Sequence, residues 1–357
     1  MKQKTILLTA TLLILAACSQ SEIETEKQRA PKEIKATSVI EGASTRAVIT
    51  GDVTLNNLTF LRKDVAADAQ TPSDFSSPDD TYTGGSRATG GAITFSATAP
   101  TYNQNNKKSF FVGFTTEGKK TESNAAGTFE WTIDGKTDIL LTEVWDAGTY
   151  QSHGSLSAMN FKHQLSRIEV ICKAEAGSSI EAVRAAWGNV TKIEVLGVSP
   201  ELKYTYSSNK AEGSGDAKAF ELLANDYSSS LNSITIHESN YGETNTMTEE
   251  QSSTPTPDAV AMIPPIKATT GDPAYSFRLK VTTAGIDGSS SPITIDNINV
   301  SLSSGPPSSN ESMEAGKIHT VVLTFKADSR TISCTSSTIE AWTDGSAGTT
   351  DVEKPEK

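Results

Sequence analysis

Residues 275–281 read YSFRLKV, and this stretch decides the fold class of the chain. Its apolar side chains, Tyr275, Phe277, Leu279 and Val281, occupy every second position. Because successive side chains of a β-strand point to opposite faces, this period of two is typical of a strand with one buried face. The stretch therefore predicts a half-buried antiparallel strand.

The same alternation recurs along the chain, between clusters of Gly, Asn, Asp, Ser and Pro. Comparable strands are predicted at residues 55–61, 92–97, 109–114, 128–133, 167–172, 192–195, 292–295 and 319–325. Such short strands between turn signals are typical of β-sandwiches and not of βαβ units. Only Ser179–Trp187 carries helical spacing, and residues 64–91 and 239–257 are expected to be long polar surface loops. The sequence predicts an all-β protein with two tandem antiparallel β-sandwich domains.

The first eighteen residues predict an exported protein. Two lysines precede an apolar run, residues 6–15, which is followed by Ala16-Ala17-Cys18. This order is typical of a secretory signal peptide, and the run is shorter than the about 20 apolar residues of a membrane-spanning helix. A Cys directly after Leu-Ala-Ala is also similar to a bacterial lipobox, in which the thiol is lipidated. We expect a signal peptide at residues 1–17 and a lipid on Cys18; an ordinary signal peptide that contains a Cys is the alternative.

A tether and a weak strand follow. Polar residues continue to Pro31 and predict a flexible linker that lifts the body off the membrane. After it, Ile34, Ala36 and Ile40 lie on one face of a short strand, which ends in a loop of small residues around Arg46.

A compositional break near residues 146–157 is the predicted domain boundary. The division is a signal peptide at 1–17, a lipidated tether with the first strand at 18–46, an N-terminal sandwich at 47–155, a C-terminal sandwich at 156–343 and a polar tail at 344–357.

Charge and cysteine content restrict the partners. The net charge of −12 argues against nucleic acid and against electrostatic attachment to anionic lipid, so membrane contact is assigned to the lipid on Cys18. Cys172 and Cys334 each lie in an alternating apolar segment, and either a disulfide or two buried thiols fits that pattern. Four scattered His residues and these thiols show no metal-ligand spacing, so neither a metal nor another cofactor is predicted.

The sequence contains no convincing catalytic motif. There is no G-x-S-x-G elbow and no H-E-x-x-H pair. Gly135-Lys136-Thr137 is similar to the end of a P-loop, but Glu130 stands where the first Gly is required. We therefore do not expect an enzyme.

Four features together resemble the fimbrillins of Bacteroidetes, the subunits of donor-strand pili. They are the lipobox at Cys18, the Thr45-Arg46-Ala47 sequence, the FKHQLSRIEV strand at residues 161–170, and the AGKI sequence at residues 315–318 with Ile339 and Trp342 beyond it. Thr45-Arg46-Ala47 is similar to the family's cleavage site for an Arg-specific protease. The resemblance spans nearly the whole chain and keeps the family's order.

This resemblance implies transthyretin-like, Greek-key sandwiches and a fimbrial subunit, structural, tip or accessory, that supports cell adhesion and biofilm formation. Family members reach the outer membrane as lipoproteins with their first strand in place, here the strand of Ile34, Ala36 and Ile40. Cleavage between Arg46 and Ala47 would remove that strand, and a strand from another subunit would replace it by β-augmentation. The implied partners are other pilin subunits, the protease, the outer membrane through the lipid, and a receptor on a host or bacterial surface. The implied final location is the fimbrium at the cell surface.

The C-terminal tail departs from the pattern of shaft subunits, whose apolar tail supplies the donor strand. Here the tail reads TDGSAGTTDVEKPEK, in which Val352 is the only large apolar residue. Three hypotheses stay open: the donor segment lies around residues 332–342, the subunit accepts a strand without passing one on, or it stays lipidated and does not polymerise.

A monomeric surface lipoprotein that binds glycan or host protein is the alternative function. Trp131, Trp145, Trp187 and Trp342 would then supply stacking faces for sugars, although Trp in β-sandwiches is more often a core residue.

Overall fold

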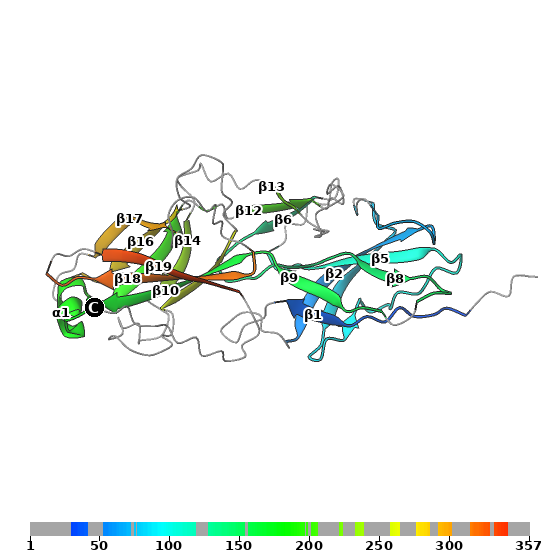
Figure 1. Cartoon of the computed structure of the whole chain (residues 1–357), viewed down its shortest axis with the longest axis horizontal. Helices are drawn as coiled ribbons and strands as arrows, with labels where there is room; N and C mark the ends of the chain where they lie inside the picture. The colour runs from blue at the N-terminus through cyan, green and yellow to red at the C-terminus, as the bar shows by residue number, and fades with distance from the viewer. Residues whose placement is uncertain are drawn as a thin grey trace, which may run out of the picture.

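The computed structural model of the protein describes residues 30–41, 53–72, 75, 77–118, 128–153, 156–196, 198, 201–205, 221–223, 233–238, 258–264, 276–285, 292–301, 315–328 and 332–341. Within these residues the regular structure is β-strand apart from one helix. The elements follow one long axis, with the strands of residues 38–65 and 108–115 toward one end and the helix of residues 180–187 with the strands of residues 276–341 toward the other (Figure 1).

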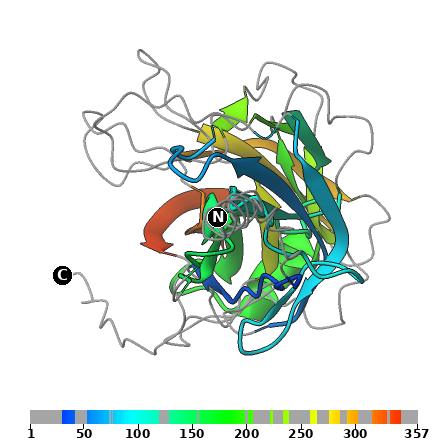
Figure 2. The same ribbon diagram turned by 90° about the vertical axis from the view of Figure 1, so that its right-hand side faces the viewer.

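The largest sheet is built from the first half of the chain and has the order β1-β9-β7-β5-β2-β3-β4, with β8 pairing with β5. Its strands are β1 (Ser38–Glu41), β2 (Leu55–Val65), β3 (Asp80–Arg87), β4 (Ile93–Thr94), β5 (Lys108–Thr115), β7 (Leu140–Thr142), β8 (Trp145–Gly148) and β9 (Met159–His163). An end-on view shows these strands curving around the long axis (Figure 2).

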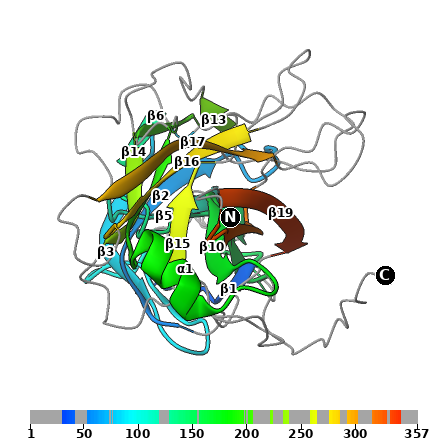
Figure 3. The same ribbon diagram turned by 90° about the vertical axis from the view of Figure 1, so that its left-hand side faces the viewer.

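Three smaller sheets contain the remaining strands. The first has the order β15-β10-β18-β19, the second β14-β11-β16-β17 and the third β13-β12-β6. Their strands are β6 (Thr128–Thr132), β10 (Ser166–Ala174), β11 (Val190–Leu196), β12 (Glu201–Thr205), β13 (Glu221–Leu223), β14 (Ser233–Glu238), β15 (Ala259–Ile263), β16 (Ser276–Thr283), β17 (Ile293–Ser301), β18 (Lys317–Phe325) and β19 (Ile332–Ala341). The opposite end-on view shows α1 together with β10, β15 and β19 (Figure 3).

The predicted all-β class is confirmed, with one difference in strand direction. Most pairs are antiparallel, but β1 pairs with β9 in parallel and β10 pairs with β18 in parallel. Alternation of side chains is the same in both directions, so the pattern that predicts a strand does not reveal the direction of its neighbour.

The predicted helix is α1 (Ile180–Trp187). The Ser179 side chain caps its N-terminus by accepting a hydrogen bond from the Ala182 N–H, and Gly188 ends it with φ of +72°. Ile180, Val183 and Trp187 are buried along one face.

The chain changes sheet between β9 and β10, inside the stretch FKHQLSRIEV. β9 hydrogen bonds to β1 and β7 in the N-terminal sheet, whereas β10 belongs to the sheet of β15 and β18. A buried side-chain contact lies at this crossover, with Nδ1 of His163 2.5 Å from Oδ2 of Asp138. The five residues of β9 therefore lie in the N-terminal sheet, although they follow the predicted boundary at residue 155.

Two buried hydrophobic clusters meet at β5. Phe111 belongs to a cluster with the N-terminal segment, β2 and β9, and its chain neighbours Phe110 and Val112 belong to a second cluster that continues into the C-terminal sheets. Successive side chains of β5 thus point into different cores, which explains why the whole strand after Lys108 is buried.

The pairing register answers the question left open for the two cysteines. Leu323 of β18 lies opposite Cys172 on one side and opposite Cys334 on the other. Two strand spacings separate the cysteine Cα atoms by about 9–10 Å, beyond the reach of a disulfide. Cys172 is a buried free thiol whose pKa burial raises well above its ordinary value.

Strand β3 lies where a polar loop was predicted, and that prediction is wrong for residues 80–87. The stretch DTYTGGSR has one large apolar residue, and Gly84-Gly85 is typical of a turn. Gly85 is required in the strand because a Cβ there would lie 2.7 Å from Cε2 of Phe60 and 2.6 Å from the carbonyl oxygen of Phe95. The predicted loop at residues 239–257 lies outside the described residues.

Candidate functional site

The N-terminal segment, residues 32–41, alternates in burial with a period of two from residue 33 to residue 40. Ile34, Ala36, Ser38 and Ile40 are buried, whereas the residues between them are exposed. Val39, on the outer face, is 51% exposed. The apolar side chains of one face therefore lie in the core, as a strand inserted into a sheet requires.

Main-chain hydrogen bonds hold this segment on both sides. On one side the N–H groups of Ile34 and Ser38 donate to the carbonyl oxygens of Pro100 and Gly91 at 2.8 and 2.7 Å. On the other side the Met159 N–H donates to the Thr37 carbonyl at 2.8 Å, and Ser38–Glu41 then pairs with β9.

The segment thereby joins the two ends of the largest sheet. Its parallel partner β9 lies beside it in the strand order, and residues 91–102 next to β4 pair with its other edge through the bridges Thr37–Ala92 and Glu33–Thr101. The position between β9 and residues 91–102 is termed the strand site. Without its occupant, β9 and residues 91–102 would each present unpaired main-chain groups.

Aromatic rings form the core beneath the strand site. The ring of Phe60 packs against Phe95 with centroids 4.9 Å apart, and Phe95 packs against Phe111 at 5.0 Å. These rings belong to the same cluster as Ile34, Ala36 and Ile40. A strand in this site is therefore held by side-chain packing as well as by hydrogen bonds.

One buried polar contact lies at the centre of the strand site. Nε of Arg87 donates to the Ser38 hydroxyl at 3.1 Å, and that hydroxyl donates to the Gly91 carbonyl at 3.1 Å. Nη1 of Arg87 also donates to the Val53 carbonyl at 2.6 Å. Both Arg87 and Ser38 are buried. A guanidinium on β3 thus contacts the N-terminal segment 49 residues away in the chain.

Gly91 allows the segment to approach this closely. A Cβ at Gly91 would lie 2.3 Å from the Ser38 carbonyl oxygen, whereas a Cβ at Gly90 would meet no atom within 4 Å. Both glycines have positive φ, +84° and +86°. A side chain at either glycine would strain the backbone to a similar extent. Only a side chain at Gly91 would also collide with Ser38.

We expect Gly91→Ala to loosen the N-terminal segment and Gly90→Ala to act as its matched control. Each substitution incurs the cost of a positive φ, about 1–2 kcal/mol, but only Gly91→Ala forces the Ser38 backbone away. Hydrogen exchange of the Ser38 amide should accelerate far more in Gly91→Ala than in Gly90→Ala. Equal acceleration in both variants would contradict the tight approach at Gly91.

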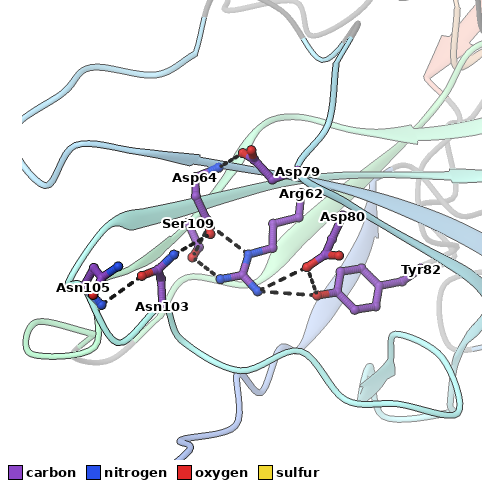
Figure 4. Close-up of polar contacts among 8 residues, drawn as sticks. All are labelled: Arg62, Asp64, Asp79, Asp80, Tyr82, Asn103, Asn105 and Ser109. Atoms are coloured by element: carbon purple, nitrogen blue, oxygen red, sulfur yellow. Dashed lines mark hydrogen bonds and ion pairs between the residues drawn. The ribbon is translucent and has the colours of Figure 1, made fainter. Parts of the chain in front are cut away.

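A second polar cluster lies on β2, β3 and β5 (Figure 4). The buried Arg62 places Nε 2.8 Å from Oδ1 of Asp64, donates from Nη2 to the Ser109 hydroxyl at 3.0 Å and donates from Nη1 to the Tyr82 hydroxyl at 3.4 Å. Burial lowers the pKa of Arg62, but the hydrogen bonds with Asp64 and Tyr82 outweigh it and the net pKa is raised. The guanidinium therefore stays charged and joins three strands, which is a structural task.

The described part of the chain offers no other evident chemical centre. Among the residues that the structure describes, no group of three or more His, Cys, Asp or Glu side chains could hold a metal ion. In the same residues, no helix has the length and apolar character needed to cross a bilayer.

The predicted site residues divide into two groups. Ile34, Ala36 and Ile40 are buried together in one cluster. Cys18, Arg46 and Ala47 lie outside the described residues. Whether the segment is removable stays a prediction.

The tryptophans proposed as sugar-stacking faces are largely core residues. Trp131, Trp145 and Trp187 are buried, and each indole N–H donates to a main-chain carbonyl, those of Thr115, Ser157 and Lys326. Trp342 lies outside the described residues. The three buried indoles present no face to a ligand, so that hypothesis is wrong for them.

Sequence reasoning missed Ser38, Arg87 and Gly91. A signal for the first was available, because Ser38 is the one polar residue on the alternating face of Ile34, Ala36 and Ile40. No local pattern pointed to the other two, whose contact with Ser38 depends on the closure of the sheet.

No family model matches the chain, and no curated protein matches it. Among solved structures, a candidate cell adhesion protein of Bacteroides uniformis aligns with a TM-score of 0.51 and 12% identity, over 87% of this chain and 98% of that chain. A candidate cell adhesion protein of Bacteroides ovatus aligns with a TM-score of 0.47 and 15% identity, over 88% and 99%. A fimbrial protein of Bacteroides vulgatus aligns with a TM-score of 0.42 and 16% identity, over 80% of this chain and 93% of that chain. The first similarity shows a shared fold across nearly the full length of both chains, as the fimbrillin resemblance implies.

Proposed function

We propose that this protein is a surface-exported subunit of an adhesive pilus, and that a strand from another subunit replaces residues 32–41 in the strand site. The single observation that carries the proposal is the closure of the N-terminal sheet by this segment. It pairs on both edges, buries one face and is followed in the sequence by Arg46. A removable strand needs these three properties.

The energetics favour a long-lived assembly once a new strand is bound. Burial of each large apolar side chain contributes roughly 1.5–3 kcal/mol, and the strand site holds Ile34 and Ile40 together with the smaller Ala36. Main-chain hydrogen bonds on both edges add to this, because an empty site leaves their partners unpaired. The empty site is therefore unstable relative to the filled one, so a bound strand dissociates rarely and a site that has lost its own strand binds a new one.

The precursor form belongs to the same proposal. A lipid on Cys18 would hold the chain at the outer membrane, and cleavage between Arg46 and Ala47 by an Arg-specific protease would release the tether together with the strand. The shared fold with the Bacteroides uniformis candidate adhesion protein supports a role in adhesion. In the structure residues 332–341, one candidate donor segment, pair with β18 of the same chain.

Cleavage at Arg46 tests the proposal. The chain from Ser19 onward is incubated with an Arg-specific protease and a fluorescent peptide of residues 30–41, and peptide uptake is followed by size-exclusion chromatography. We expect the wild type to take up the peptide and Arg46→Ala not to. Arg29→Ala is the control: it loses a cleavage site that precedes the strand, so it should take up the peptide like the wild type. Light scattering on the same column reports whether cleaved chains also form oligomers.

Two outcomes would contradict the proposal. One is a cleaved, folded wild-type chain that takes up no peptide, and the other is equal uptake by Arg46→Ala. Circular dichroism of each cleaved sample establishes that it is folded.

A further inference from the structure

We infer that Arg87 selects the incoming strand, and that the strand accepted at this site carries a hydroxyl residue at the position of Ser38. This inference rests on the proposed function and specifies its partner. The donor is a strand with large apolar residues at the positions of Ile34 and Ile40, a small residue at that of Ala36, and Ser or Thr at that of Ser38.

The first argument is the cost of leaving the Arg87 contact unmade. Nε of Arg87 donates to Ser38 Oγ at 3.1 Å in an environment where both residues are buried. An apolar side chain at this position would remove that acceptor and exclude water from its place. A buried charged donor that loses its acceptor is strongly destabilised, more so than a neutral one.

The second argument is the size of the available space. The Ser38 hydroxyl bridges Arg87 and the Gly91 carbonyl, at 3.1 Å to each. The Ser38 main-chain N–H donates to the same carbonyl at 2.7 Å. The Gly91 backbone therefore lies directly against residue 38, and a long side chain there would displace it. The site accepts a short side chain that has an oxygen on Cβ.

The third argument is that the other positions discriminate less sharply. Ile34, Ala36 and Ile40 face an apolar core formed by Phe60, Phe95 and their neighbours. Apolar pockets separate aliphatic side chains of similar volume only weakly, whereas a buried polar group rejects a partner that lacks the matching atom. Position 38 therefore decides which strands bind among those with the right alternation.

Competition among peptides tests the inference. The protease-cleaved chain carrying the fluorescent peptide of residues 30–41 is titrated with unlabelled peptides of the same length: the native sequence and its Ser38→Thr, Ser38→Ala and Ser38→Val versions. We expect the Ala and Val peptides to compete about tenfold to a hundredfold less well than the native one, and the Thr peptide to lie within about threefold of it. Equal competition by the native and Ala peptides would overturn the inference.

An Arg87→Met chain supplies the second arm. If Arg87 is the selecting residue, this variant should bind the native and Ala peptides within about threefold of each other. Discrimination that persists in Arg87→Met would overturn the role of Arg87. The peptide series on the wild-type chain decides the requirement at position 38 even if Arg87→Met does not fold.

Failure of the proposed function gives a different result. If the native peptide itself does not bind to the cleaved wild-type chain, both strand replacement and selection by Arg87 are wrong. If the native and Ala peptides enter equally, strand replacement stands and only the selection by Arg87 is wrong.

Discussion

Ile34→Asp is expected to release the N-terminal segment from the strand site while leaving the C-terminal sheets folded. Ile34 is 1% exposed, so the substitution removes about 1.5–3 kcal/mol of apolar burial and places a carboxylate in the core. An unpaired buried carboxylate costs several kcal/mol more. Hydrogen exchange should therefore accelerate at the Ile34 and Ser38 amides and at the Tyr102 and Met159 amides that donate to the segment.

Val39→Asp is the matched control for this substitution. It changes a branched aliphatic residue to Asp in the same N-terminal segment, but Val39 is 51% exposed on the opposite face. We expect a loss of less than about 1 kcal/mol there, because the carboxylate stays in water. If both variants accelerate exchange at the same amides equally, the alternation of the segment in the sheet is wrong.

Phe60→Ala is expected to lower the free energy of unfolding by about 3–5 kcal/mol, since it deletes a fully buried ring from the core beneath the strand site. The ring lies between two glycines on neighbouring strands: a Cβ at Gly85 would be 2.7 Å from Cε2 of Phe60, and a Cβ at Gly113 would be 2.6 Å from Cε1. The two glycines thus leave room for the ring. Equilibrium urea unfolding of the chain from Ser19 onward measures the loss.

A pair of double variants shows whether the ring is the reason for the glycines. At Gly113 the atoms closer than 3 Å belong to the Phe60 side chain, whereas at Gly85 the carbonyl oxygens of Phe95 and Thr94 also lie within 2.9 Å. Phe60→Leu should therefore reduce the cost of Gly113→Ala, by about 1–2 kcal/mol, and should not rescue Gly85→Ala. If Phe60→Leu reduces the unfolding free-energy cost of both glycine substitutions equally, the carbonyl oxygens near Gly85 move aside at little cost and the ring alone explains both glycines.

The local pattern predicted much of the fold because burial in a strand or helix has a fixed period. The alternation of apolar residues predicted β5, β10, β16 and β18. The helical spacing from Ser179 to Trp187 predicted α1, which Ser179 caps. Strand β3 was not predicted, because its face against the core carries Gly85, which has no side chain to contribute to an alternating pattern. A glycine that makes room for a neighbouring ring is indistinguishable in sequence from a glycine in a turn.

The candidate site could be predicted in part. The shared face of Ile34, Ala36 and Ile40 was visible in eight residues of sequence, and these side chains are buried together. The contact between Ser38 and Arg87 was not visible, because it spans 49 residues and forms only when residues 91–102 close against the segment. In the sequence Ser38 looked like an interruption of the apolar pattern. In the structure its hydroxyl is the polar centre of the strand site.

The sequence by itself determined that the described part of this protein is built of strands with one short helix, and that its N-terminal segment has a buried face. Only the tertiary structure decided that this segment runs parallel to β9, that it joins the two ends of one sheet, and that a buried arginine contacts its Ser38. The physical reason is that periodicity depends on a residue and its near neighbours, which the sequence lists in order. Strand pairing uses main-chain N–H and C=O groups that are the same at almost every residue, so the choice of partner depends on how distant side chains pack into a common core.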